Sequence, residues 1–225
     1  MKNPEISKSD IVLFRSNDNQ NSTELKNFLR ALAFLGYERP YRFSYVERDG
    51  ALIEKMTLKE NILLDSIPNT LCTSKEFQLS EYLTKTGNVH LMGLFNQIKN
   101  LDKYPGETED NKRKLTALMK GLIPKTKFLF LDQPEKGLEE FQIKLLLKAV
   151  SYQAKNQNKI VFVRPLHEQL WNNHITKELI REKTGTFKVT KFANHQIREK
   201  FLEGRKTTEG YLKFIQYKYN KNSAA

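Results

Sequence analysis

The segment Phe128–Asp132 constrains the fold of this chain most strongly. It consists of four apolar residues followed by an aspartate, and the turn-forming residues Pro134 and Gly137 come shortly after it. A short apolar run bounded in this way is typical of a strand buried on both faces of a parallel sheet. Ligands in open α/β folds bind beyond the carboxyl ends of such strands. We therefore expect Asp132 to lie at the functional edge of a sheet.

Strands and helices are predicted to alternate along most of the chain. Apolar runs at residues 11–14, 41–46 and 160–163 have the length and composition of strands. Helical patterns cover residues 22–36, 74–85, 89–101, 108–122 and 139–154, and a further helix is expected to start at residue 57. This alternation predicts an α/β fold with a mainly parallel sheet flanked by helices.

The chain is predicted to have two parts. Residues 1–173 form the core, with a helical subdomain at about 49–122, and residues 174–225 form a basic α/β appendage packed on it. Within the appendage, residues 186–192 and 211–219 alternate like strands, and residues 194–202 have a helical pattern. The appendage carries 12 Lys and Arg against 5 Asp and Glu.

Composition limits the classes of partner and compartment. The net charge of +12 favours an anionic partner, such as nucleic acid, a membrane surface or an acidic protein. The single cysteine, Cys72, excludes a disulfide framework, and no stretch approaches the roughly 20 apolar residues of a membrane span. The first ten residues lack the apolar run of a signal peptide. We expect a cytoplasmic protein, or one peripheral on the inner face of the cytoplasmic membrane.

Five segments stand out by their residue content and order. They are residues 15–23, 45–48 with 56–62, 104–118, 128–139 and 160–165. Together they resemble the ATP-binding domain of ABC transporters, of the type that serves lipoprotein release and cell division. The resemblance covers residues 11 to 170 and implies the fold of the P-loop ATPases. Only 14 residues precede Arg15, which implies a reduced N-terminal β part without the aromatic that stacks on adenine.

The first segment is similar to the family's phosphate loop, G-x-N-G-x-G-K-S-T. Asn17, Ser22 and Thr23 match, but every glycine is missing and Asn21 stands in place of the lysine. The glycines allow the backbone N–H groups to point at phosphates, and the lysine supplies a positive charge. The resemblance therefore implies a vestigial nucleotide site, and neither ATP nor magnesium is expected as a cofactor.

Three further positions depart from the family where it performs hydrolysis. The resemblance gives Asp132 the magnesium position, but Gln133 replaces the general base, and a neutral amide cannot accept a proton from water. Arg48 replaces the glutamine that senses the metal and the γ-phosphate, and Pro165 replaces the switch histidine. His167 lies two residues further on and would need a shift of register to take that place. The histidines show no metal-ligand spacing, so no metal site is expected.

The signature that binds the partner subunit's ATP is also altered. The family reads L-S-G-G-Q, and this chain has Thr108, Glu109, Asp110, Asn111 and Lys112. Two carboxylates at this position would repel an anion.

Residues 49–100 correspond to the part that meets a membrane permease in the family, and one segment of this region matches the family closely. Residues 56–62 are close to the family's L-T-V-x-E-N-I, and the residues expected to bind a partner are Arg48, Met56, Leu58, Glu60 and Asn61. An ordinary helical subdomain is the alternative interpretation of this region.

The motifs are altered, while the scaffold residues between them match the family. This combination predicts a pseudo-ATPase, which is an ABC-type domain that neither binds nor hydrolyses ATP in the usual way. Such a chain would dock on a permease or on an active ABC ATPase, and a homodimer is a further alternative. A second hypothesis is a protein that binds nucleic acid or an anionic membrane surface through its basic C-terminal segment. There lysines and arginines alternate with aromatics, although a strand with aromatics in the core gives the same pattern. A third hypothesis is an ATP-binding subunit with unusual motifs.

Overall fold

One mixed sheet organises the described part of the chain. The computed structural model describes residues 5–16, 24–37, 42–64 and 78–193. Its strands are β1 (Ile11–Arg15), β2 (Phe43–Val46), β3 (Phe128–Asp132), β4 (Ile160–Arg164), β5 (Lys177–Arg181) and β6 (Phe187–Lys191). They form a six-stranded sheet in the order β2-β3-β4-β1-β5-β6, in which only the β5–β6 pair is antiparallel. The predicted α/β fold with a mainly parallel sheet is therefore confirmed.

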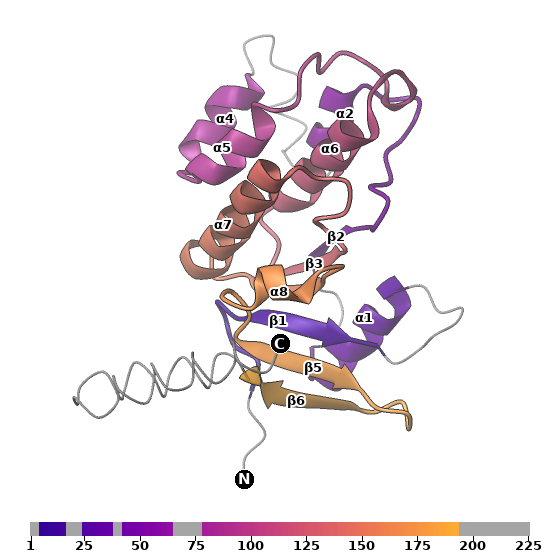
Figure 1. The fold of residues 1–225 in the computed structure, drawn as a ribbon, viewed down its shortest axis with the longest axis vertical. Helices are drawn as coiled ribbons and strands as arrows, with labels where there is room; N and C mark the ends of the chain where they lie inside the picture. Colours follow the sequence, from indigo (N-terminus) through magenta and orange to yellow (C-terminus); the bar gives the residue numbers. More distant parts are fainter. Residues whose placement is uncertain (1–4, 17–23, 38–41, 65–77, 194–225) are drawn as a thin grey trace, which may run out of the picture.

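Alternate strand residues pack against different helices, as the two-residue period of a strand requires. On one face, Phe14, Phe130 and Phe162 join a core with Phe28 of α1 (Glu24–Phe34). The opposite face contributes Leu13, Leu129, Leu131, Val161 and Val163 to a second, larger core. Figure 1 shows α1 beside β1 and apart from the other long helices. The sheet is thus covered on both faces, which explains its nearly continuous apolar strands.

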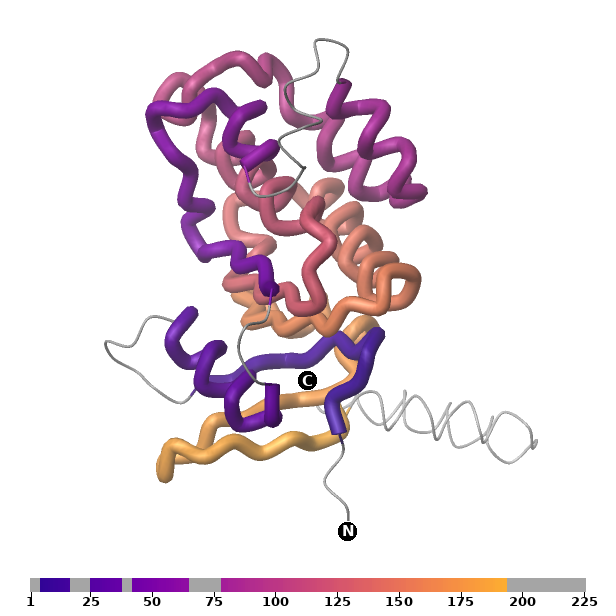
Figure 2. The backbone as a smooth tube through the Cα atoms, turned by 180° about the vertical axis from the view of Figure 1, so that it is seen from behind, coloured from indigo at the N-terminus to yellow at the C-terminus, as the bar shows by residue number. Residues whose placement is uncertain are grey.

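The second face supports a helical layer. Its members are α2 (Leu58–Leu63), α4 (Leu79–Lys85), α5 (Val89–Phe95), α6 (Asp110–Leu122) and α7 (Glu140–Asn156). Figures 1 and 2 show these helices gathered at one end of the molecule, away from β5 and β6. The short α8 (Glu168–Trp171) follows β4 and buries Trp171 completely. Among the described residues, no helix is both long enough and apolar enough to cross a membrane.

The approach of α6 to β2 depends on a glycine. A Cβ atom added to Gly121 would lie 2.2 Å from Cγ2 of Val46, far inside van der Waals contact. Because Val46 is the last residue of β2, this contact fixes the helix against the point where β2 ends. The same edge of the sheet carries the candidate site.

Two features differ from the sequence-based expectation. Strand β5 was not predicted, because its five residues, Lys-Glu-Leu-Ile-Arg, include three charged ones and bury only Leu179. It pairs with β1 on one side and with β6 on the other, so both strands belong to the same sheet as β1 to β4. Helix α5 ends at Phe95 rather than near residue 101. The expected helix at 194–202 and strand at 211–219 lie outside the described residues.

Candidate functional site

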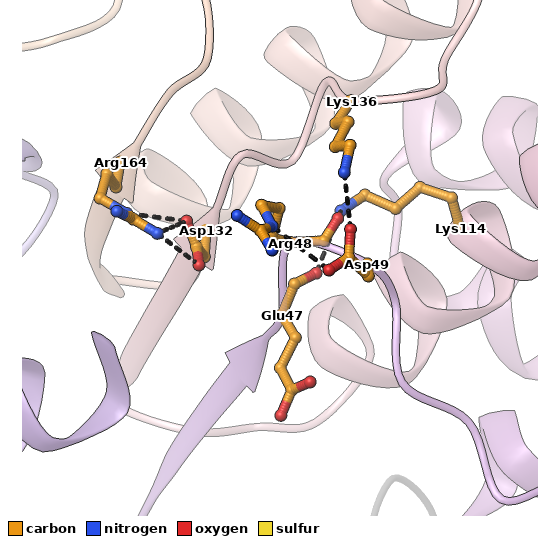
Figure 3. Close-up of polar contacts among 7 residues, drawn as sticks. All are labelled: Glu47, Arg48, Asp49, Lys114, Asp132, Lys136 and Arg164. Atoms are coloured by element: carbon orange, nitrogen blue, oxygen red, sulfur yellow. Dashed lines mark hydrogen bonds and ion pairs between the residues drawn. The ribbon is translucent and has the colours of Figure 1, made fainter. Parts of the chain in front are cut away.

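Asp132 and Arg164 form the centre of the site. They occupy paired positions at the carboxyl ends of the neighbouring parallel strands β3 and β4. Nε of Arg164 donates to Oδ1 of Asp132 and Nη2 donates to Oδ2, each at 2.8 Å (Figure 3). The Asp132 side chain is 6% exposed and that of Arg164 is 28% exposed. Two parallel charge-assisted bonds of this kind are among the strongest polar contacts in proteins.

The family resemblance implies that the aspartate of this ion pair would help to hold magnesium. A magnesium ion needs oxygen ligands held in near-octahedral geometry. Both oxygens of the Asp132 carboxylate already accept hydrogen bonds from a fixed cation. A metal ion would therefore compete with the Arg164 guanidinium for the charge of the same carboxylate. No group of three or more His, Cys, Asp or Glu within the described ranges has the spacing of a metal site.

Gln133 turns the chain sharply after β3. Its φ of 42° lies in the left-handed region, which is unusual for a residue other than glycine. Its backbone N–H donates to the carbonyl oxygen of Arg164 at 2.7 Å, so the turn is tied to the end of β4. The side chain is half-buried. Its amide offers no base at the position where the family has its catalytic carboxylate.

Glu135 connects the loops that follow β3 and β4. It is 3% exposed, and its Oε1 accepts the backbone N–H of His167 at 2.8 Å. Its Oε2 is buried and has no hydrogen-bond partner among the described residues. Pro165 is half-buried, and the His167 side chain is exposed at the start of α8. His167 therefore contributes its backbone to the contact between the loops, while the residue itself is exposed.

Lys114 of α6 caps the end of β2 from inside the protein. It is 4% exposed, and its Nζ donates to the carbonyl oxygens of Glu47 (3.1 Å) and Arg48 (2.8 Å). Burial lowers the pKa of Lys114 from 10.5 to about 8, while Asp132, Asp49 and Glu135 oppose this shift. The cation thus contributes to a network of fixed charges around the strand ends.

Asp49 joins β2 to the loop after β3. It forms ion pairs with Lys136 at 2.7 Å and with Arg48 at 3.2 Å, all on exposed side chains (Figure 3). The Lys136 bond is the main cause of a lowered pKa for Asp49. These residues line a cavity of ≈ 420 Å³, completed by Asp110, Arg113, Lys114 and Gly137. Arg48, expected as a degenerate and partner-binding position, therefore lies on an accessible surface.

The residues at the signature positions bond within the chain. Thr108 donates its hydroxyl to the carbonyl of Pro105, and Glu109 pairs with Lys112 at 3.1 Å. Asn111 Nδ2 donates to the carbonyl of Gly137 at 2.8 Å and to Oε1 of Gln142 at 2.7 Å. In return, Gln142 Nε2 donates to Oδ1 of Asn111. These bonds tie the start of α6 to the loop before α7 and to α7 itself.

The expected partner-binding residues have two different roles. Met56 is half-buried and Glu60 is exposed, but Leu58 and Asn61 have no exposed surface and cannot touch a partner. Asn61 accepts from the Ile53 N–H at 2.8 Å and donates to the carbonyls of Ile53, Met56 and Thr57. Glu60 completes the expected capping box with Thr57. Asn61 shapes the loop from within, because an amide side chain can both donate and accept, whereas Leu58 belongs to the hydrophobic core.

Several expected positions cannot be compared with the structure. Asn17, Asn21, Ser22 and Thr23 lie outside the described residues. Sequence reasoning also missed the roles of Arg164, Lys114 and Glu135. One signal could have identified Arg164. It is a cation that directly follows the predicted strand at 160–163, and this is the next predicted strand along the chain after the one that ends in Asp132. Nothing in the sequence pattern signalled Lys114, because the same helix also contains Lys112 and Lys120, which are only half-buried.

The fold is that of the ATP-binding domains of ABC transporters. An ATP-binding subunit of an ABC transporter aligns over 87% of this chain and 83% of its own, with a TM-score of 0.57 and 14% identity. A metal-chelate-type ABC transporter aligns over 82% and 72%, with a TM-score of 0.53 and 17% identity. The ATP-binding cassette MJ0796, a dimer bound to ADP and Pi, aligns over 85% and 88%, with a TM-score of 0.52 and 12% identity.

These likenesses concern the fold alone. No protein-family model matches the sequence, and a search of the curated proteins finds no match.

Proposed function

We propose that this chain is a non-hydrolysing relative of the ABC ATPases that acts as a structural or regulatory subunit. The Asp132–Arg164 ion pair is the observation that carries this proposal. The Arg164 guanidinium pairs with the carboxylate that the resemblance would give to magnesium, and so supplies a positive charge at the strand ends. This pairing supports a role without ATP or magnesium as a cofactor.

The altered signature supports the same proposal. Its Asn111 is committed to Gly137 and Gln142, and its Glu109 to Lys112. These side chains stabilise the junction between α6 and α7 in a single chain. Asp110, which lines the neighbouring cavity, adds a negative charge where a γ-phosphate would have to approach.

The proposed partner is a membrane permease subunit or an active ABC ATPase. The loop before α2 presents Ile53 (42% exposed) and Met56. Tyr104 (46% exposed) lies next to this loop in the structure, because the carbonyl of the preceding Lys103 accepts the backbone N–H of Leu58. Exposed apolar side chains beside charged ones are typical of an interface. Relatives of the same fold are described as parts of ABC transporters, so we place the chain at the inner face of the cytoplasmic membrane.

A partner-capture experiment tests this surface. The full chain and an Ile53→Asp/Tyr104→Asp variant are used as baits on detergent-solubilised native membranes, with Phe141→Asp/Leu170→Asp as a control of equal charge change. All four residues are exposed. We expect the native chain and the control to retain a membrane permease or an ABC ATPase, and the first variant to lose it. Recovery of neither class by the native chain, or equal loss in both variants, would contradict the proposal.

The described part of the basic C-terminal segment, up to residue 193, has the pattern of a strand with its aromatic residues in the core. In β6, Phe187 and the following Phe192 are buried, whereas Lys188 and Lys191 are exposed. The aromatics there belong to the core and are not available to stack on bases. The remaining residues of this segment that suggested nucleic-acid binding lie beyond residue 193.

A further inference from the structure

A second cavity lies at the amino ends of β3 and β4, at the opposite end of these strands from Asp132. It has a volume of ≈ 410 Å³, within the range of small-molecule sites. Three segments line it: the end of α4, the connection from α6 to β3, and the connection from α7 to β4. Its residues are Tyr82, Lys85, Thr86, Ile123, Lys125, Thr126, Gln157 and Lys159.

The lining of this cavity is cationic. It includes three lysines, one from each segment, and contains no aspartate or glutamate. Within the described ranges, no salt bridge joins Lys85, Lys125 or Lys159 to an acid. Like charges gathered around a concave surface raise the local concentration of anions.

Lys159 is the buried member of this group. It is 2% exposed, and its Nζ donates to the carbonyls of Pro124 (2.7 Å) and Leu122 (3.3 Å) and to Oε1 of Gln153 (3.2 Å). Burial lowers its pKa from 10.5 to about 8, and no carboxylate opposes the shift. The protein thus carries a buried cation whose charge is offset by neutral dipoles alone. A bound anion would supply the missing opposite charge.

We propose that this cavity, the lysine pocket, binds a small soluble anion that carries two or more phosphate groups. The exposed Lys85 and Lys125 suit a multivalent anion, because each ammonium is a point charge that binds phosphate without demanding a planar geometry. The buried Lys159 already donates its three N–H bonds within the protein and adds only its charge. Thr126 and Gln157 add neutral hydrogen-bonding groups to the lining. The pocket lies at the amino ends of β3 and β4, so it is separate from the Asp132 site at their carboxyl ends.

Calorimetric titration of the full chain with inorganic pyrophosphate, without magnesium, tests this proposal. We expect saturable binding with a Kd below about 1 mM. A Lys85→Gln/Lys125→Gln variant should bind about tenfold more weakly or worse, because it loses two charged donors. Both lysines are exposed, so the variant should remain folded. The matched control is Lys148→Gln/Lys188→Gln, which removes the same charge from exposed positions on α7 and β6.

The buried lysine provides a second measurement. An anion in the lysine pocket should raise the pKa of Lys159, so at about pH 8 binding should take up protons. Proton uptake is measured from the dependence of the binding enthalpy on the ionisation enthalpy of the buffer. No binding at millimolar pyrophosphate, equal weakening in the control, or proton uptake no larger than in a Lys159→Met variant would overturn the proposal. The comparison with this variant is needed because pyrophosphate itself exchanges protons near this pH. A vesicle-sedimentation arm with anionic lipids distinguishes a soluble ligand from a headgroup, and vesicle binding lost only in the pocket variant would also overturn it.

Discussion

Arg164 and Asp132 hold each other by two hydrogen bonds of 2.8 Å at the ends of neighbouring strands. Their register in the sheet places them side by side, so the pair forms without any rearrangement of the loops. In this chain the charge of the Asp132 carboxylate is neutralised by Arg164 of the neighbouring strand β4.

Removing one member of this pair should destabilise the protein more than removing both. Arg164→Ala leaves the buried Asp132 carboxylate without its cation, and losses of about 3 kcal/mol are common for such changes. The double variant Arg164→Ala/Asp132→Ala should recover part of that loss. Chemical denaturation of the four proteins in this cycle gives the coupling energy, which we expect to reach about 1–3 kcal/mol. A coupling close to zero would show that the pair does not hold the strand ends.

The two buried lysines make stability dependent on pH. Lys114 and Lys159 have native pKa values of about 8, against 10.5 for an ordinary lysine. Between these values the unfolded chain binds more protons than the folded one, so the free energy of unfolding rises with pH. Each lysine adds a slope of at most about 1.4 kcal/mol per pH unit. Urea denaturation from about pH 7 to 9.5 should show this rise, stopping short of the range where tyrosines ionise.

Lys114→Met is the variant that isolates one of these contributions. It should reduce the pH slope by up to half while leaving the Lys159 contribution in place. An exposed lysine, Lys148→Met, is the control and should leave the slope unchanged. A stability that is flat or falls over this pH range would contradict the assigned burial of both ammonium groups.

The contact between α6 and β2 can be tested by a compensating pair. Gly121→Ala places a methyl group 2.2 Å from Cγ2 of Val46 and should cost about 1–3 kcal/mol. Val46→Ala removes that methyl, so the double variant should be more stable than the sum of the two single effects predicts. Thermal denaturation of the set measures this. Strict additivity would mean that the two residues are not in contact.

Asn61 should control the shape of the loop that precedes α2. Asn61→Asp keeps the size of the side chain but removes the donors to the carbonyls of Ile53, Met56 and Thr57. The buried, unpaired groups should cost about 1–3 kcal/mol or more. Hydrogen exchange should be faster at residues 53–57 in this variant than in an Asn96→Asp control, since Asn96 is exposed. Equal exchange in both would contradict the role given to Asn61.

The sequence predicts the sheet well because its inner strands are simple. Residues 128–132 and 160–163 are apolar throughout, and burial on both faces produces that pattern. Strand β5 is different, since its lysine, glutamate and arginine are only half-buried next to the edge strand β6. Its strand character comes from pairing with β1, which is a long-range contact and leaves no local signal.

The sequence predicts where the residues of the candidate site lie along the chain, but it does not predict which contacts their side chains make. Asp132, Gln133 and Arg48 could be located from motif order, because the resemblance fixes their place at the strand ends. The partner that each side chain chooses depends on register and on packing across elements. Arg164 reaches Asp132 through the pairing of β3 and β4, and Lys114 reaches the end of β2 from α6. Those contacts require the folded arrangement.

Binding of magnesium and ATP tests the central claim most directly. A fluorescent ATP analogue is titrated with the Lys85→Gln/Lys125→Gln variant at equilibrium. This variant is used so that binding at the Asp132 site is measured without a contribution from the lysine pocket. Hydrolysis is followed by phosphate release in the same samples. We expect no magnesium-dependent saturation up to about 1 mM nucleotide and no release above the protein-free rate. Magnesium-dependent binding that Asp132→Asn abolishes would show that Asp132 still holds a metal ion, and would contradict the account.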